Sequence, residues 1–340
     1  MSSPSSAASK RSRTKHPAAM TVYGIVAAAV IGTAGFLSIQ SANGGTDIRT
    51  NLSIIAPGSV GGGNDTFARE QQQAMRQSGL VANAQVVNIP GAGGTIGLTQ
   101  LATMTGQANV LMNAGTVMLG AIELNDSPTD MSDVTPIARV AEEYNVVVVP
   151  TDAPFNTLDE MIAAWKVNPK AFPFTGGSAG SIDQLLIAQL GLKVGIDPSQ
   201  ITYIPKTGGG EALQSLLAGT AKALSTGYGE VADQIEAGRV KAIGLAAPQR
   251  FEGVDIPTFA EQGYATDMTN WRGIVAPPGI TAEERAALQE LVKETSETPE
   301  WAETVKLYYW NPVYLDGPEF EKFLKEDQAR IAGLIKELDL

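Results

Sequence analysis

Glycine-rich turns carry the strongest chemical signal in this sequence. Four of them, at residues 58–65, 90–95, 176–181 and 206–210, each follow a short apolar segment and precede a helix-like one. Glycine lets the backbone adopt positive φ angles and approach a ligand closely. The first turn of a helix presents unpaired N–H groups and the positive end of the helix dipole, which together bind anions. The repeated device predicts a cleft in which several helix starts hold a small anion.

The spacing of the glycines excludes the two common nucleotide motifs. A phosphate-binding P-loop needs lysine directly after its last glycine, and Asn64 follows Gly63. The dinucleotide fingerprint needs glycine or alanine three residues after its second glycine, and Ile96 stands there after Gly93. Tight structural turns remain an alternative role for each turn taken singly.

The residue inventory disfavours enzymatic chemistry. Cysteine is absent, which excludes a thiolate nucleophile, a disulfide and a cysteine-based metal site. His16 is the only histidine, and it lies in the basic N-terminal segment. The Ser-His-Asp triad and the usual zinc ligand sets are therefore not available to the rest of the chain. Carboxylate pairs pass this filter, so an exported hydrolase that uses carboxylates stays open as an alternative.

Residues 1–45 are typical of a targeting segment. Lysine and arginine occupy four of positions 10–15, and residues 20–39 carry no charge. A cleavable signal peptide has an apolar region of about 7–15 residues, whereas about 18 uncharged residues can span a bilayer. A cleaved signal peptide and a retained membrane anchor both fit. Either one places the remaining chain outside the cytoplasm, in the periplasm or at the cell surface.

The exported part is strongly acidic. Residues 1–42 contain four of the 24 basic residues and none of the 36 acidic ones, so the remainder has 20 basic residues and a net charge of −16. Such a surface repels nucleic acid and anionic lipid, and we expect neither as a partner. An anionic ligand would have to be held by local hydrogen-bond donors.

The order of elements predicts an α/β fold. We predict strands at residues 52–56, 86–89, 110–113, 146–149, 172–174, 201–204, 221–224, 240–245 and 273–275. Helices are predicted at residues 65–76, 95–104, 157–168, 182–190, 210–217, 282–294, 300–306 and 318–336. Thr157 and Glu160 have the spacing of a helix capping box.

Six sequence segments together resemble the TctC/Bug family, the extracytoplasmic binding components of tripartite tricarboxylate transporters. They are IIAPGSVGGGNDTFAR, NIPGAGGTIG, NAGT, GGSAGSIDQL, YIPKTGGGEALQSLLAG and NWRGIVAPPG, in the family's order from about Asn51 onward. The resemblance implies a two-lobed periplasmic-binding-protein fold (type II, flytrap), with mixed sheets flanked by helices. It also implies a carboxylate ligand, a membrane permease as partner and no cofactor or metal. We expect a monomer, with lobe one at residues 46–148 and 271–340 and lobe two at residues 149–270.

Carried over by position, the resemblance assigns ligand contacts to both lobes. The first lobe would contribute Gly61, Gly62, Gly63, Asn64, Asp65, Gly91, Ala92, Gly93, Gly94, Asn113 and Thr116. The second lobe would contribute Ser178, Gly180, Ser181, Asp183, Thr207, Gly208, Gly209, Thr226 and Tyr228. First-lobe amides and bound water would hold the carboxylate, and the second lobe would contact the distal end of the ligand.

Several residues have an alternative structural role. Asp65 and Asp183 each stand where a helix cap is expected. Lys206 and Arg272 are candidates for direct pairing with an anion. Many family members have aspartate where this chain has Thr226, so the resemblance does not identify the ligand.

We therefore predict a solute-binding protein that captures a small tricarboxylate or dicarboxylate between two lobes and delivers it to a transporter permease, without chemistry. A ligand-sensing subunit of a two-component signalling system is the alternative, because it would use the same fold and differ only in its partner.

Overall fold

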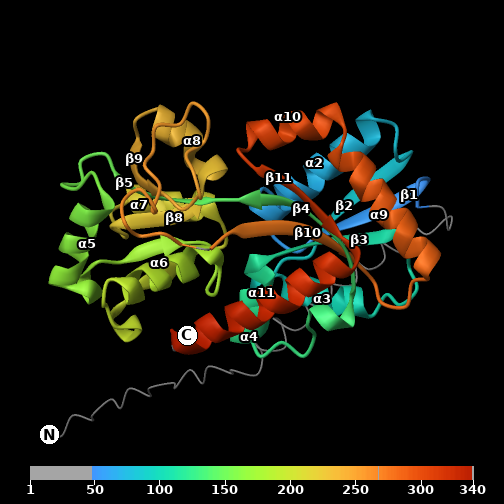
Figure 1. The fold of residues 1–340 in the computed structure, drawn as a ribbon, viewed down its shortest axis with the longest axis horizontal. Coiled ribbons are helices and arrows are strands. Elements are labelled where there is room, and N and C mark those ends of the chain that lie inside the picture. The colour runs from blue at the N-terminus through green and yellow to red at the C-terminus, as the bar shows by residue number, and fades with distance from the viewer. Residues whose placement is uncertain (1–47, 267, 339–340) are drawn as a thin grey trace, which may run out of the picture.

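Two mixed β-sheets, each with its own helices, organise the computed structural model, which describes residues 48–266 and 268–338 (Figure 1). The strand order is β11-β4-β10-β3-β1-β2 in the first sheet and β7-β6-β8-β5-β9 in the second. The predicted two-lobed α/β fold class is confirmed. The predicted targeting segment lies outside the described residues, and within them no helix is long and apolar enough to cross a membrane.

The first sheet joins chain segments from both ends of the described sequence. Its strands are β1 (Asn51–Ala56), β2 (Asn83–Asn88), β3 (Val110–Gly115), β4 (Thr135–Glu143), β10 (Asn270–Ala276) and β11 (Asn311–Asp316). Its helices are α2 (Gly63–Gln77), α3 (Thr95–Ala102), α4 (Thr116–Leu124), α9 (Ala282–Ser296), α10 (Pro299–Leu307) and α11 (Gly317–Glu337), with short turns η1 (Ala92–Gly94) and η2 (Met131–Asp133). Strands β1, β2 and β3 run parallel, and β10 is antiparallel to β3 and β4. The helices cover both faces of this sheet, as buried parallel strands require.

The second sheet is formed by one continuous part of the chain. Its strands are β5 (Asn145–Pro150), β6 (Phe174–Gly176), β7 (Tyr203–Pro205), β8 (Ala223–Gly227) and β9 (Val240–Leu245). Its helices are α5 (Leu158–Val167), α6 (Ile182–Lys193), α7 (Gly209–Leu217) and α8 (Tyr228–Glu236), with short turns η3 (Pro169–Ala171) and η4 (Pro198–Gln200). The β-branched run of β5 is fully buried and pairs with β8 and β9.

The chain crosses between the sheets twice. Only Tyr144 separates β4 from β5, and the return crossing leads directly into β10 at Asn270. Residues 145–148 therefore pair within the second sheet, although the sequence analysis places them in lobe one. The run from 146 to 149 forms one strand, and hydropathy gives no sign of which sheet it joins.

Four elements have no counterpart in the sequence analysis: β4, α4, α8 and β11. Helices α4 and α8 begin directly after strand residues, at Gly115 and Gly227, without a polar capping side chain. Strand β4 mixes charged and apolar residues, so it shows no clean alternation.

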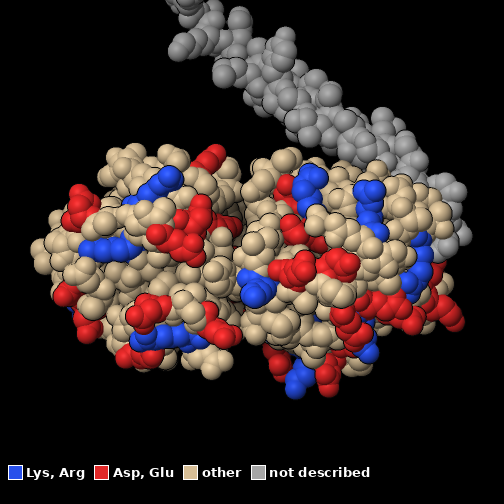
Figure 2. Space-filling model, turned by 90° about the horizontal axis from the view of Figure 1, so that it is seen from above, with Lys and Arg blue, Asp and Glu red and all other residues tan. Residues whose placement is uncertain are grey.

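The lobes also touch away from the crossover strands. A Cβ added to Gly120 on α4 would lie 3.1 Å from the carbonyl carbon of Gly180, and one added to Gly229 on α8 would lie 3.2 Å from that of Tyr308. These contacts lie on opposite sides of the crossing strands (Figure 1). On the face shown in Figure 2, acidic and basic side chains are interspersed over both lobes, which meet along a narrow waist.

Candidate ligand-binding site

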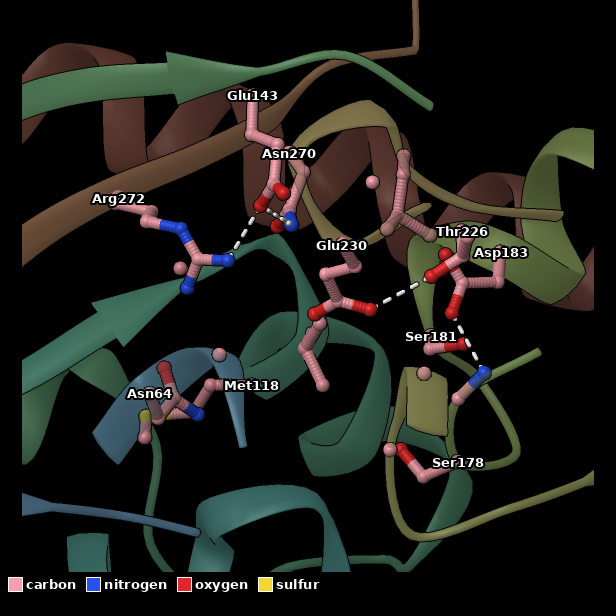
Figure 3. A pocket seen from close by; sticks show the side chains of 18 of the residues that line it. Asn64, Met118, Glu143, Ser178, Ser181, Asp183, Thr226, Glu230, Asn270 and Arg272 are labelled. Carbon is pink, nitrogen blue, oxygen red and sulfur yellow. Dashed lines mark hydrogen bonds and ion pairs between the residues drawn. The ribbon is translucent and has the colours of Figure 1, made fainter. Parts of the chain in front are cut away.

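Both lobes line a cavity of about 120 Å³ beside the crossover strands (Figure 3). A larger cavity of about 600 Å³ adjoins it and shares residues such as Gly63, Gly209 and Arg272. The smaller cavity lies below the range of about 300–1,000 Å³ that is usual for ligand pockets, whereas the larger one lies within it. Together they form one region between the lobes in which a small solute has room.

Five helices begin at the wall of this region: α2, α4, α6, α7 and α8. None of their N-cap residues makes a side-chain capping hydrogen bond; these are Gly62, Gly115, Ser181, Gly208 and Gly227. Of the helices that begin elsewhere, α5, α9 and α10 have threonine side-chain caps, whereas α3 and α11 have none. The uncapped starts leave first-turn N–H groups for a ligand and direct the positive ends of five helix dipoles at one place.

Asp183 is buried in the first turn of α6. Its carboxylate accepts hydrogen bonds from the Gly177 amide at 2.6 Å and from Asn145 Nδ2 at 2.5 Å. Burial raises the pKa of the Asp183 carboxyl to about 6, because the charged form loses hydration, although the two hydrogen bonds oppose this rise. The carboxyl thus stabilises the 177–183 turn and places an acidic group in the second-lobe wall of the cavity.

Glu230 projects into the cavity from the first turn of α8 (Figure 3). Its Oε2 accepts a hydrogen bond of 2.7 Å from Thr226 Oγ1. The surrounding protein desolvates the carboxyl and the nearby Glu143 repels its charge, so the pKa of Glu230 is raised well above its ordinary value. The residue as a whole is nevertheless exposed to solvent, because it borders both cavities.

Arg272 on β10 and Glu143 at the end of β4 form a buried ion pair beside the cavity. Glu143 also accepts a hydrogen bond of 3.1 Å from Asn270 Nδ2. The Arg272 guanidinium lies 5.7 Å from the ring centroids of both Phe67 and Trp310. The two crossover strands thus hold the guanidinium at the junction of the lobes.

The structure brings about half of the predicted contact residues to the smaller cavity. These are Gly63, Asn64, Asn113, Ser178, Ser181, Asp183, Thr207, Gly208, Gly209 and Thr226. Gly61 and Gly62 line the larger cavity. Asp65, Gly91, Ala92, Gly93, Gly94, Thr116, Gly180 and Tyr228 line neither of the two.

The turn at 91–94 lies behind the cavity wall. A Cβ added to Gly94 would lie 3.0 Å from Met118 Cε and 3.2 Å from Pro57 Cβ, and Gly93 faces Ala121 of α4. Both glycines have positive φ angles, 102° and 63°. This turn therefore packs against α4 and supports it.

Other predicted residues have structural partners instead. The Asp65 carboxylate accepts hydrogen bonds from Gly61, Arg69 and Asn88 and so shapes the turn before α2, but the N-cap of that helix is Gly62, so Asp65 is not the cap. Thr116 Oγ1 donates to the carbonyl of Thr269 at 2.8 Å.

The remaining two predicted residues, Gly180 and Tyr228, pack against other parts of the protein. Gly180 forms the contact with Gly120, and Tyr228 packs edge-on against Tyr309 with ring centroids 4.7 Å apart. Lys206, a candidate for charge pairing, lines neither cavity.

Four conspicuous wall residues were not among the predicted ligand contacts: Met118, Glu143, Glu230 and Asn270. Three of them lie on α4, β4 and α8, elements that the sequence analysis also did not predict. Among the described residues, no group of three or more histidine, cysteine or acidic side chains is arranged to hold a metal ion.

Comparison with known proteins assigns the chain to a family. The family model TctC, described as a tripartite tricarboxylate transporter family receptor, matches residues 67–340. The chain belongs to the TctC family. A TctC-family protein is a solute-binding receptor of the periplasmic-binding-protein type, as the resemblance implied.

Individual relatives and solved structures are similar to this chain. A UPF0065 protein from the gbd 5′ region of Cupriavidus necator is 27% identical over 263 residues, which cover 75% of this chain and 77% of that protein. A TctC solute-binding protein from Polaromonas, solved without ligand, is 26% identical with a TM-score of 0.65, over 85% of this chain and 98% of that one. MatC from Rhodopseudomonas palustris with bound malate is 22% identical with a TM-score of 0.71, over 84% and 99%.

Proposed function

We propose that this TctC-family protein captures a small organic carboxylate, of the dicarboxylate or tricarboxylate class, between its lobes and delivers it to the permease of a tripartite tricarboxylate transporter. It would do so outside the cytoplasm and without changing the solute. The observation that carries the proposal is the convergence of five uncapped helix starts on one interlobe region. The malate bound to MatC supports the choice of a carboxylate.

Backbone donors are strong enough for this task. A hydrogen bond to a charged group contributes about 1.5–3 kcal/mol. Three or four such bonds therefore supply roughly the 8 kcal/mol of a micromolar complex, after the costs of association. In our proposal, the amides near Gly63, Asn64 and Asn113 in the first lobe anchor the carboxylate.

Closure of the lobes would signal to the permease that a ligand is bound. A ligand stabilises the closed arrangement only through its higher affinity for that arrangement, which requires contacts with both lobes at once. The cavity wall includes Asn64 and Asn113 from one lobe and Ser178 and Thr207 from the other. A carboxylate that reaches both sets favours closure.

A thermal-shift screen of the purified protein against organic acids, amino acids and sugars tests the proposal, with calorimetry on each hit. A ligand at about one hundred times its Kd adds roughly 2.7 kcal/mol to the free energy of unfolding, which is easily detected. We expect a carboxylate among the hits, and we expect its methyl ester not to bind. A response to neutral sugars alone, or equal affinity for acid and ester, would contradict the proposal.

A further inference from the structure

The charges at the cavity wall restrict the ligand further than the helix starts do. The ionisable residues that line the smaller cavity are three carboxylic acids, Glu143, Asp183 and Glu230, and one base, Arg272. Arg272 is already paired with Glu143. The two remaining acids both belong to the second lobe, so a second carboxylate of the ligand would meet like charge there.

Glu230 has an oxygen available for a ligand. Thr226 donates to Oε2, and no other residue that the structure describes donates to this carboxyl. The other oxygen, Oε1, faces the first lobe and lies 3.3 Å from the position of a Cβ added to Gly63. Figure 3 shows Glu230 near the middle of the cavity, between Arg272 with Asn64 on one side and Ser178 on the other.

Arg272 has donors available close by. Its side chain is 91% buried, and Glu143 is its single hydrogen-bond partner in the described part of the chain. The buried Nε–H has no acceptor among the residues that the structure describes. The same added Cβ on Gly63 would lie 2.9 Å from Arg272 Nη2, so the basic and acidic groups flank one small space.

A ligand that satisfies both groups carries both charges. We infer that this protein binds an amino acid, with the carboxylate at the first-lobe helix starts and Arg272 and the ammonium group at Glu230 Oε1. The ammonium group supplies the donors that a free carboxylate oxygen in a confined site requires. The inference rests on the proposed capture of a small organic carboxylate and specifies that this ligand also carries an ammonium group. A metal ion is not an equivalent occupant, since the described acids do not form a metal-binding group.

The pH dependence of binding should differ between ligand types. Glu230 faces Glu143 of β4, Arg272 of β10 and Asp183 of α6, and Asp183 lies near Tyr203 of β7. The pKa values of Glu230 and Asp183 are both raised. An ammonium group binds better as these acids ionise, so amino-acid affinity should rise from about pH 5 to about pH 7.5, whereas the affinity of a dicarboxylate should fall.

Matched ligand pairs test the inference by calorimetry on the purified protein. Each pair consists of an amino acid and the hydroxy acid of the same skeleton: glycine and glycolate, alanine and lactate, aspartate and malate, glutamate and 2-hydroxyglutarate. We expect the amino member of the best-binding pair to bind roughly tenfold tighter or more at about pH 7.5. Equal or tighter binding of the hydroxy acid overturns the inference and leaves the proposed function intact. If no acid of the panel binds, the inference fails, and if no tricarboxylate or other organic acid of the thermal-shift screen binds either, the proposed function fails with it.

A variant locates the ammonium site. Glu230→Gln keeps the shape of the side chain, and it should weaken amino-acid binding roughly tenfold or more while leaving the hydroxy acid unchanged or tighter. Glu236→Gln, an exposed position at the other end of α8, is the matched control and should change neither. Equal losses for both ligands in Glu230→Gln would overturn the assignment. The pH profile of the unaltered protein tests it without any substitution, and a fall in amino-acid affinity from about pH 5 to about pH 7.5 would overturn it.

Discussion

The two faces of the interlobe cavity differ in how they meet a ligand. The first-lobe face presents the starts of α2 and α4 together with the neutral side chains of Asn64, Asn113 and Met118. The second-lobe face presents three helix starts and carries the acids Asp183 and Glu230. The crossover strands supply the buried pair of Arg272 and Glu143 between them. Both faces offer amides, but only the second-lobe face also carries acids.

This difference suggests a division of labour. Backbone amides hold any carboxylate of suitable size, because they contact only the group that all such ligands share. Ionisable side chains distinguish ligands by their remaining groups, since an unmatched charge in a confined site is costly. Specificity in this chain should therefore be altered by substitutions in the second lobe, whereas substitutions in the first lobe should weaken all ligands alike.

The largest expected effect comes from removing the charge between the faces. Arg272→Met leaves the buried Glu143 without its partner, and we expect the free energy of unfolding to fall by about 3–5 kcal/mol in urea denaturation. Adding Glu143→Gln to this variant should recover much of the loss, because it removes the uncompensated charge. Simple additivity of the two losses would show that the pair does not act as a unit.

The acidity of the second-lobe face should appear in the pH dependence of stability. The raised pKa of Asp183 means that the folded protein holds a proton that the unfolded chain releases. Its contribution is complete below pH 4 and is lost as pH rises to about 6, by up to about 3 kcal/mol. In Asp183→Asn, the free energy of unfolding should no longer fall by this amount between pH 4 and about pH 6.

Asp65 of the first lobe provides a control of opposite sign. Burial alone would raise its pKa, but hydrogen bonds from Arg69, Gly61 and Asn88 lower it overall. Its contribution to stability is therefore present at neutral pH and is lost as pH falls below its ordinary pKa. If Asp65→Asn and Asp183→Asn changed the pH profile in the same direction, the opposite pKa shifts of these two acids would be wrong.

A substitution outside the cavity can destabilise the closed arrangement of the two lobes. Gly120→Ala places a methyl group against the backbone of Gly180, and we expect ligand affinity to fall roughly tenfold because the closed arrangement is disfavoured. Gly333→Ala, in a helix with open space around the glycine, is the control. Small-angle scattering with saturating ligand should show a less compact Gly120→Ala protein. Identical profiles and affinities would show that this contact is not part of closure.

The smallest expected effect concerns a helix that faces away from the cavity. Thr157 Oγ1 caps α5 by accepting a hydrogen bond of 3.2 Å from the Glu160 amide. Thr157→Ala should lower the free energy of unfolding by about 1 kcal/mol and leave ligand affinity unchanged in calorimetry. A change in affinity would mean that α5 is coupled to the cavity.

The sequence predicted the elements whose boundaries are marked by a capping residue or a glycine-rich turn. The cap at Thr157 is confirmed, although the Glu160 carboxylate accepts from the amide of Asn156 rather than from that of Thr157. Helices α2, α6 and α7 follow glycine-rich turns and were also predicted, with boundaries that differ by a few residues. Single-residue boundaries depend on hydrogen bonds that a hydropathy pattern does not encode.

Two causes explain the parts of the site that the sequence did not predict. Helices α4 and α8 lack both a glycine run and a capping side chain, and the missing cap is also what leaves their N–H groups for a ligand. Glu230 was overlooked because α8 was. Glu143 lies at the end of β4, and its role depends on pairing with Arg272, which is 129 residues away in the sequence. Such long-range pairs have no signal in local spacing.

A crystal structure of the protein with its tightest-binding organic acid tests the central claim most directly. The account predicts a ligand carboxylate within about 2.7–3.2 Å of backbone amides at the starts of α2 or α4, with the rest of the ligand against Asp183 and Glu230. A carboxylate held by side chains of the second lobe alone, or a ligand bound outside the interlobe region, would contradict it.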